Sequence, residues 1–494
     1  MLQFSFKQKF LLNVIFIGLA FSFSGCGKGK LESPEATNTI RFQWNAVAPD
    51  TMAEIKVLNQ FGEAIPGAQI LIGSARGNPF QNNFIETDSS GVGKIPQEWT
   101  VPAHVTVDAA GYVRQTLLNQ KPGNMIIKLG SSYLTQRAVL RGQVTQLPVV
   151  NGDKMIDFGL VMPALSRADI LNFNLDQVIS PYQDILSVAN QDARLPSNVS
   201  LPTQKENYIF NFKIEKPIYR LMVPTLGPKT YFAATGRFPF KEVVNEIRAG
   251  KEFYELLNYF SITGGGLREA QIIAGQTNLD IPGTELQFKA SVQVQSANVL
   301  ADEVLLMLSV SDIGGNLIPT DVKRMQPNQA VTLTSMANKP AYIVSVIKKQ
   351  AEFKNSSASD RISAALAPYK AGQTQSLLPL VGPPSITGTD AYVITLPPSP
   401  STGGVNPIAV SATISDLFET QDGDSKITQS NHRWEIIGLG WGTRINLPAW
   451  PLANVSPKKK VEVNFIGSMT NRAVTLDDSL IEAATHVSHT SIEF

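Results

Sequence analysis

Two serine–lysine pairs have the spacing that covalent acyl-transfer chemistry uses. Ser345 and Lys348 are three residues apart, and so are Ser456 and Lys459. That chemistry needs the serine at the start of a helix, with the lysine one turn later on the same side. The first pair lies in an apolar run typical of a strand, the second follows a loop, and the companion Ser-Asp-Asn and Lys-Thr-Gly sequences are missing. We therefore assign neither pair a catalytic role, and we predict no catalytic residue.

Two groups of polar side chains have the composition of a metal site. His486 and His489, with Glu482 one turn upstream, could share one face of a helix. The chain lacks the His-Glu-x-x-His pattern of zinc enzymes, so we favour no metal there. The run from Asp422 to Asp424, with Glu419 and Asp416 nearby, offers carboxylates that calcium prefers, but it does not match the EF-hand loop. We interpret it as a polar β-turn, with a weak calcium site as the alternative, and we predict no metal or cofactor.

Three of the five tryptophans, Trp434, Trp441 and Trp450, are close together in the sequence. Exposed tryptophan rings stack on sugars or anchor a protein partner. We name these three as candidate ligand-binding residues. The alternative, which we favour, is that they fill the core of the last domain.

The only cysteine, Cys26, follows a segment typical of an export signal. Lys7 and Lys9 precede a stretch from Phe10 to Phe23 that is apolar apart from two residues. This stretch is too short to cross a bilayer but suits the hydrophobic part of a signal peptide. A mature chain that begins at this cysteine would have no disulfide and no cysteine-based metal site.

The sequence Phe23-Ser24-Gly25-Cys26 resembles the lipobox of bacterial lipoproteins, although this family usually has leucine in place of Phe23. The resemblance implies cleavage between Gly25 and Cys26 and a lipid on the Cys26 thiol. Because Gly27 follows instead of aspartate, it also implies the outer membrane, with both of its faces left open. The alternatives are a plain secretory signal cut after Ser24 and an uncleaved anchor.

The balance of charge argues against nucleic acid as a partner. The chain has 42 basic and 41 acidic residues, and Lys7 and Lys9 belong to the signal. A near-neutral chain without a basic stripe offers no electrostatic surface for phosphate backbones.

Turn-forming residues and alternating patterns predict a mainly β fold, with several β-sandwich domains of Ig-like or prealbumin-like type. A flexible tether at 26–45 precedes a first sandwich at 46–130. Its sequences Val57–Gly62, Ile65–Ala68, Thr87–Gly91 and Ala110–Tyr112 resemble the carboxypeptidase regulatory-like, or transthyretin-like, domain. The resemblance implies a non-catalytic accessory sandwich.

The rest of the chain divides into three predicted regions. Residues 131–285 form a mixed α/β middle region. It contains one helix, or two short ones, between Lys241 and Phe260, with an interruption at Gly250 and a stop at Gly264-Gly265-Gly266. Residues 286–383 form a β domain with a strand at 286–295 and a short helix at 360–367. Residues 384–494 form a C-terminal β-sandwich.

Our leading hypothesis is a membrane-anchored envelope lipoprotein that acts as a binding or structural module, with an envelope protein or glycan as partner. One competing hypothesis is an envelope-polymer hydrolase that uses the first domain as an accessory module. Another is a subunit of an outer-membrane assembly. A hydrolase needs a deep cleft of ionisable residues, expected within 131–285. A binding module needs an exposed patch, expected around Trp441 and Trp450.

Overall fold

The computed structural model describes most of the chain beyond the predicted tether. The described residues are 42–45, 52–73, 84–95, 99–132, 138–147, 155–167, 169, 183–188, 191–201, 216–223 and 227–494, the last range with short gaps at 298, 328, 355–359, 390, 402, 423–424, 451 and 453–455. Strands predominate and the described helices are short, which confirms the predicted mainly β class. None of the described helices is long and apolar enough to cross a membrane.

Two sheets in the N-terminal part share one hydrophobic core. The first has the order β1-β8-β2-β5, with strands at Phe42–Asn45, Asn124–Leu129, Glu54–Asn59 and Val92–Lys94. The facing strands are β3 (Gln69–Ile72), β4 (Ile85–Glu86), β6 (Ala103–Asp108) and β7 (Arg114–Gln120). Buried aliphatic side chains alternate along both sheets and meet in this core. β1 consists of the last four residues of the predicted tether.

The facing strands continue into a sheet that crosses the predicted domain boundaries. Twelve of the described strands form it, in the order β22-β21-β24-β25-β32-β31-β28-β29-β7-β6-β3-β4. Its remaining members are β21 (Glu303–Ile313), β22 (Asn316–Met325), β24 (Ala341–Lys349), β25 (Arg361–Pro368), β28 (Asn406–Asp422), β29 (Ser425–Leu439), β31 (Lys459–Ser468) and β32 (His486–Glu493). β29 joins β7 in parallel, and this pairing connects the C-terminal strands to the N-terminal ones.

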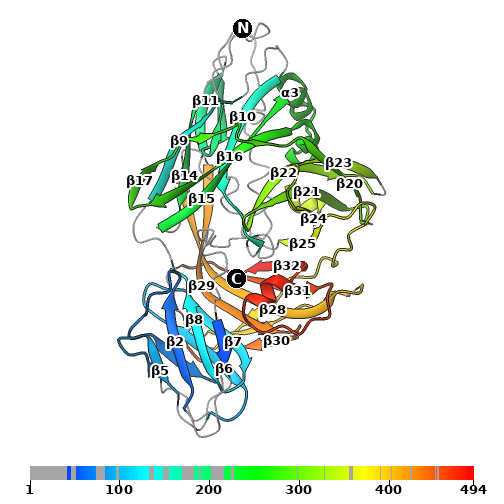
Figure 1. Ribbon diagram of the computed structural model, residues 1–494. Coiled ribbons are helices and arrows are strands. Elements are labelled where there is room, and N and C mark those ends of the chain that lie inside the picture. Colours follow the sequence, from blue (N-terminus) through cyan, green and yellow to red (C-terminus); the bar gives the residue numbers. More distant parts are fainter. Residues whose placement is uncertain are drawn as a thin grey trace.

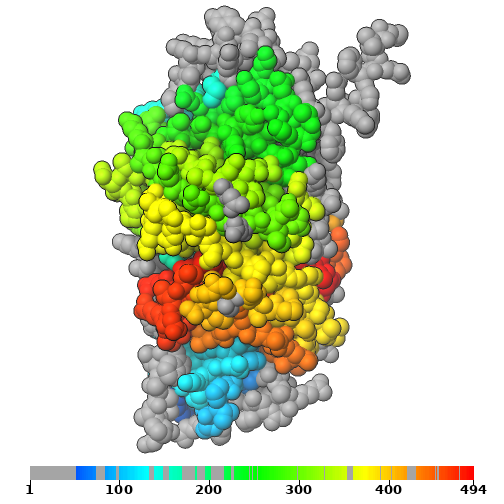
Figure 2. All heavy atoms as spheres, turned by 90° about the vertical axis from the view of Figure 1, so that its right-hand side faces the viewer, coloured from blue at the N-terminus to red at the C-terminus, as the bar shows by residue number. Residues whose placement is uncertain are grey.

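Figure 1 shows how this connection orders the molecule in space. The last segment of the chain, with β28, β31 and β32, lies between the N-terminal sheets and the strands of the middle regions. The side view in Figure 2 shows the same succession, from cyan through orange and red to yellow and green. Chain order and spatial order therefore differ.

The region predicted as mixed α/β is mainly β. One sheet has the order β13-β10-β15-β16-β19 and another the order β14-β9-β17, with β18 also paired to β9. The strands are β9 (Ala138–Thr145), β10 (Met155–Pro163), β13 (Val199–Ser200), β14 (Ile218–Val223), β15 (Gly227–Pro239), β16 (Ser261–Ile272), β17 (Gly275–Asn278), β18 (Ile281–Pro282) and β19 (Leu286–Gln287). A separate hairpin pairs β11 (Gln183–Val188) with β12 (Gln191–Pro196).

The predicted helix from Lys241 to Phe260 is divided into short pieces. α3 spans Phe240–Arg248, α4 spans Phe253–Leu256, and the 3-10 turn η1 spans Leu257–Tyr259. The break falls at Gly250, which has a φ of 85° that helices do not accept. Gly264, Gly265 and Gly266 do not stop a helix, because they lie inside β16.

Two further predictions need correction. Residues 360–367 do not form a helix. From Arg361 onward this stretch is β25, which pairs with β24 on one side and β32 on the other. The predicted strand at 286–295 is split into β19 and β20 (Ala290–Gln295). The intervening Phe288 turns into a small core beside Phe232.

Two small sheets cover one face of the long sheet. β20 pairs with β23 (Ala330–Ser335) and packs on β21 and β24 through one apolar cluster. β26 (Ser385–Thr387), β27 (Val393–Thr395) and β30 (Arg444–Asn446) form the other sheet, which packs on β28, β29 and β31. α5 (Gln350–Lys354) and α6 (Asp478–Ala483) are short helices at strand ends.

Candidate functional site

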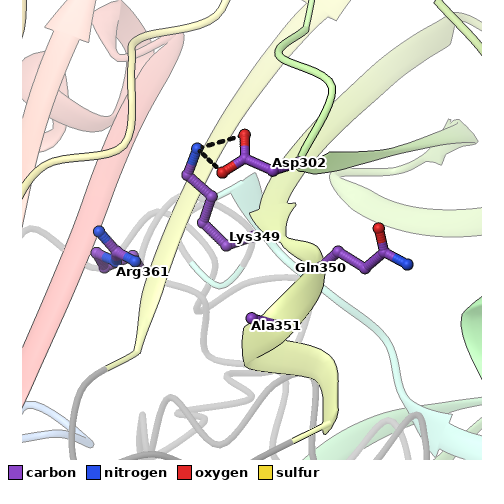
Figure 3. Close-up of a pocket in the computed structure, with 5 residues that line it drawn as sticks. All are labelled: Asp302, Lys349, Gln350, Ala351 and Arg361. Carbon is purple, nitrogen blue, oxygen red and sulfur yellow. Dashed lines mark hydrogen bonds and ion pairs between the residues drawn. The ribbon is translucent and has the colours of Figure 1, made fainter.

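An open pocket of about 660 Å³ lies at one end of the long sheet, where β24 ends and β25 begins. We call it the β24–β25 pocket, and its volume lies within the usual range for small-molecule sites. Figure 3 shows the side chains that line it. They are Asp302, Lys349, Gln350, Ala351 and Arg361.

The strand register places the two cations of the pocket side by side. Lys348 pairs with Ile362 across β24 and β25, so Lys349 and Arg361 are the next cross-strand neighbours. Side chains on a strand alternate between its faces. Lys349 and Arg361 therefore leave the same face of the sheet, whereas Lys348 leaves the opposite one.

Carboxylates hold both cations in place. The Lys349 ammonium lies 2.8 Å from Asp302 and 3.3 Å from Glu303, and the Arg361 guanidinium pairs with Glu352. Glu303 and Glu352 are buried, with 7% and 8% of their side chains exposed, whereas Asp302 is 68% exposed. The hydrogen bond from Lys349 lowers the pKa of Asp302. Burial lowers the pKa of Lys349, but the bonds to Asp302 and Glu303 outweigh it and raise the pKa overall.

A second set of charges is buried on the opposite face of the same sheet end. Lys348 forms an ion pair of 2.7 Å with Asp360, and both side chains are largely buried. Farther along this face, the Lys460 ammonium lies 2.8 Å from Glu462. The His489 Nδ1 is 2.8 Å from the side-chain oxygen of Asn464 and donates to it.

Burial lowers the pKa of His489, and the nearby Lys460 and Lys348 lower it further. Glu462 and Asp360 act in the opposite direction without reversing the shift. His489 is therefore neutral near pH 7, and the 4.0 Å contact of its Nε2 with Glu462 is not an ion pair.

The three candidate tryptophans do not form one exposed aromatic surface. Trp434 is fully buried and its indole nitrogen donates to Thr116, while the indole nitrogen of Trp441 donates to the carbonyl of Ile466. The Arg114 guanidinium lies 4.6 Å from the ring centre of Trp434 and 4.3 Å from that of Trp450. In this arrangement Trp434 presents no ring face to a ligand.

The two serine–lysine pairs serve structural contacts. The Ser345 hydroxyl donates to Gln375, on the face of β24 opposite to Lys348. The Ser456 hydroxyl donates to the carbonyl of Leu417, and the Lys459 ammonium donates to the carbonyl of Ser456. Both hydroxyls thus donate to other groups, and Lys348 is paired with Asp360.

The remaining candidates are separated or lie outside the described part. His486 and His489 are both on β32, where a three-residue spacing puts them on opposite faces. The described residues include no group of three or more His, Cys, Asp or Glu that could hold a metal. Gly25 and Cys26 lie outside the described residues, as do Gly423 and Asp424 of the proposed calcium turn.

The sequence reasoning did not find the β24–β25 pocket. Two pairs of neighbouring charged residues are the features of the sequence that could have indicated it. Asp302 and Glu303 stand at the start of one strand, and Lys348 and Lys349 stand at the end of another. Such charges at strand ends are usually solvated, and only the pairing of β24 with β21 and β25 brings them together.

Comparisons with known proteins do not assign a family. No family model matches the chain, and no curated protein matches it. Among solved structures, the chain is similar to BcpA, the major pilin subunit of Bacillus cereus, at 8% identity, over 66% of this chain and 97% of the pilin. The TM-score is 0.12, which carries no argument about fold or function.

Proposed function

We propose that this protein is a lipid-anchored envelope protein that acts as a binding module, with the β24–β25 pocket as its ligand site. The observation that carries the binding role is the pocket itself. The Lys349 ammonium and the Arg361 guanidinium come from two paired strands, and buried carboxylates hold them in place. Polar groups fixed on regular strands recognise a ligand with little cost of ordering.

The anchor rests on the residues before and at Cys26. Two acyl chains on this cysteine would hold the protein stably on a membrane, because each buried CH₂ contributes about 0.8 kcal/mol. The glycine at position 27 supports the outer membrane as the location. The β-rich N-terminal part, with its two sheets over one core, supports the resemblance to an accessory sandwich.

Replacement of the cysteine tests the anchor. Cys26→Ala should abolish labelling by palmitate and move the protein from the membrane fraction to the soluble fraction, because no other thiol is present. Ser22→Ala, which keeps the cysteine and a small side chain, is the control and should remain labelled. Labelling that persists in Cys26→Ala would rule out the lipoprotein assignment.

Crosslinked affinity capture from intact cells tests the binding role. The wild-type protein should recover envelope glycan or one stoichiometric envelope protein, and the double variant Lys349→Met and Arg361→Met should lose it. Lys458→Met, which removes an exposed lysine on a different part of the sheet, is the control. Equal recovery by all three proteins would show that the pocket is not the binding site.

A further inference from the structure

The β24–β25 pocket is arranged as a site for two oxygens of one anionic group. Lys349 and Arg361 are cross-strand neighbours on one face, and both line the pocket. Two adjacent cations of this kind bind a carboxylate or a phosphate through charge-assisted hydrogen bonds. Their own counter-charges, Glu303 and Glu352, are buried and keep the cationic heads oriented.

Asp302 already pairs with one of the two cations that such a group would need. Both of its carboxylate oxygens lie 2.8 Å from the Lys349 ammonium. The dashed lines in Figure 3 mark these contacts. Because the Asp302 side chain is 68% exposed, its ion pair contributes little to stability, and its carboxylate moves aside at small cost.

Arg361 keeps hydrogen-bonding capacity for a ligand. Its Nε and Nη2 atoms are directed at one oxygen of Glu352. No hydrogen bond from Nη1 is formed within the described part of the chain. Because guanidinium groups bind oxyanions in a fixed fork, this remaining edge suits a second ligand oxygen.

The pocket is larger than a single oxyanion. Its volume of about 660 Å³ leaves room for the rest of a small polar molecule beside the anionic group. We propose that the pocket binds an acidic saccharide through its carboxylate or phosphate group, and that Asp302 is the internal competitor which that group displaces. This inference rests on the proposed binding function of the same pocket.

Calorimetric titration of the full-length protein with glucuronate, glucose 6-phosphate and neutral glucose tests the proposal. We expect the acidic sugars to bind and glucose not to bind at the same concentrations. Binding of only one acidic sugar would also support the proposal and would identify the group as carboxylate or phosphate. Absence of binding by both would overturn it.

Asp302→Asn separates the competitor role from a merely structural one. It keeps the shape of the side chain but removes the charge, so the acidic sugar should bind about tenfold more tightly than to the wild type. Lys349→Met should weaken binding at least tenfold, and Lys458→Met should leave it unchanged. Misfolding would not raise the affinity, so tighter binding would support the competitor role. Unchanged or weaker binding by Asp302→Asn would show that the ligand does not displace Asp302.

The same experiments distinguish this inference from the function on which it rests. If acidic sugars fail to bind while Cys26 is still lipidated and capture still depends on Lys349 and Arg361, only the nature of the ligand is wrong. If capture is independent of both cations, the binding role of the pocket fails as well.

Discussion

Several ionisable side chains in this protein lie where water does not reach them. His489 is 2% exposed and is held through Nδ1 by Asn464. Lys460 and Glu462 are also buried, and they neutralise each other at 2.8 Å. Charges in such positions are tolerated only when they are paired, because the loss of hydration is costly. The histidine avoids this cost by staying neutral.

We expect His489 to make the protein sensitive to mild acid. Its pKa is lowered in the fold, so the unfolded chain takes up the proton first as the pH falls. The contribution to stability is full above about pH 6.5 and is lost as the pH falls towards the folded-state pKa. The loss is at most about 1.4 kcal/mol per pH unit. Urea denaturation at pH 7.0 and at pH 5.5 measures it.

His489→Gln keeps an amide donor for Asn464 but does not titrate. Its free energy of unfolding should therefore change less between the two pH values than that of the wild type. An equal change in both proteins would mean that this histidine does not control the acid response.

β16 needs glycine at three consecutive positions, Gly264, Gly265 and Gly266. A Cβ atom on Gly266 would lie 1.9 Å from the carbonyl oxygen of Pro282, and one on Gly265 would lie 2.4 Å from that of Ala233. The glycines therefore allow the backbones of β18 and β15 to approach β16 closely. The three glycines are therefore explained by the close approach of neighbouring backbone, and not by the end of a helix.

Gly266→Ala should destabilise the protein by about 2–3 kcal/mol, because the methyl group meets backbone that cannot move alone. The free energy of unfolding in urea measures this effect. Gly382→Ala is the matched control, since a Cβ there meets nothing within 4 Å. Similar stability of the two variants would contradict the close packing of β16.

At the scale of the whole molecule, the pairing of β7 with β29 joins the N-terminal strands to the C-terminal strands. Arg114 on β7 forms an ion pair of 2.9 Å with Asp108 and donates to the carbonyl oxygen of Trp450. Its guanidinium also contacts the rings of Trp434 and Trp450. One buried side chain of the N-terminal part thus contacts two tryptophans of the C-terminal part.

We expect the wild-type protein to unfold with the N-terminal and C-terminal strands in one calorimetric transition. Arg114→Ala leaves Asp108 without its partner and removes both ring contacts. It should lower stability by about 3 kcal/mol and separate an earlier transition for the N-terminal sheets. Arg444→Ala, at an exposed position, should keep the wild-type profile. A single transition in Arg114→Ala would contradict the role of this junction.

Strands and turns governed by neighbouring residues could be predicted from the sequence. Within the first predicted sandwich, Gln69–Ile72 form β3, and Thr87–Gly91 form a turn because Asp88 accepts hydrogen bonds from the backbone of Ser90 and Val92. The proposed lipidation of Cys26 also rests on the sequence alone, because that residue lies outside the described part. Local patterns suffice here because the contacts that decide these features are a few residues apart.

Pairing between strands that are far apart in the chain decided the features that local sequence patterns did not predict. Residues 361–368 are a strand because β24 and β32 lie on either side, although their local pattern favoured a helix. Trp434 is buried because β29 meets β7, and the β24–β25 pocket exists because Asp302, Lys349 and Arg361 come from three paired strands or their ends. Sheet hydrogen bonds join residues at any distance along the chain, so local periodicity does not determine which strands become neighbours.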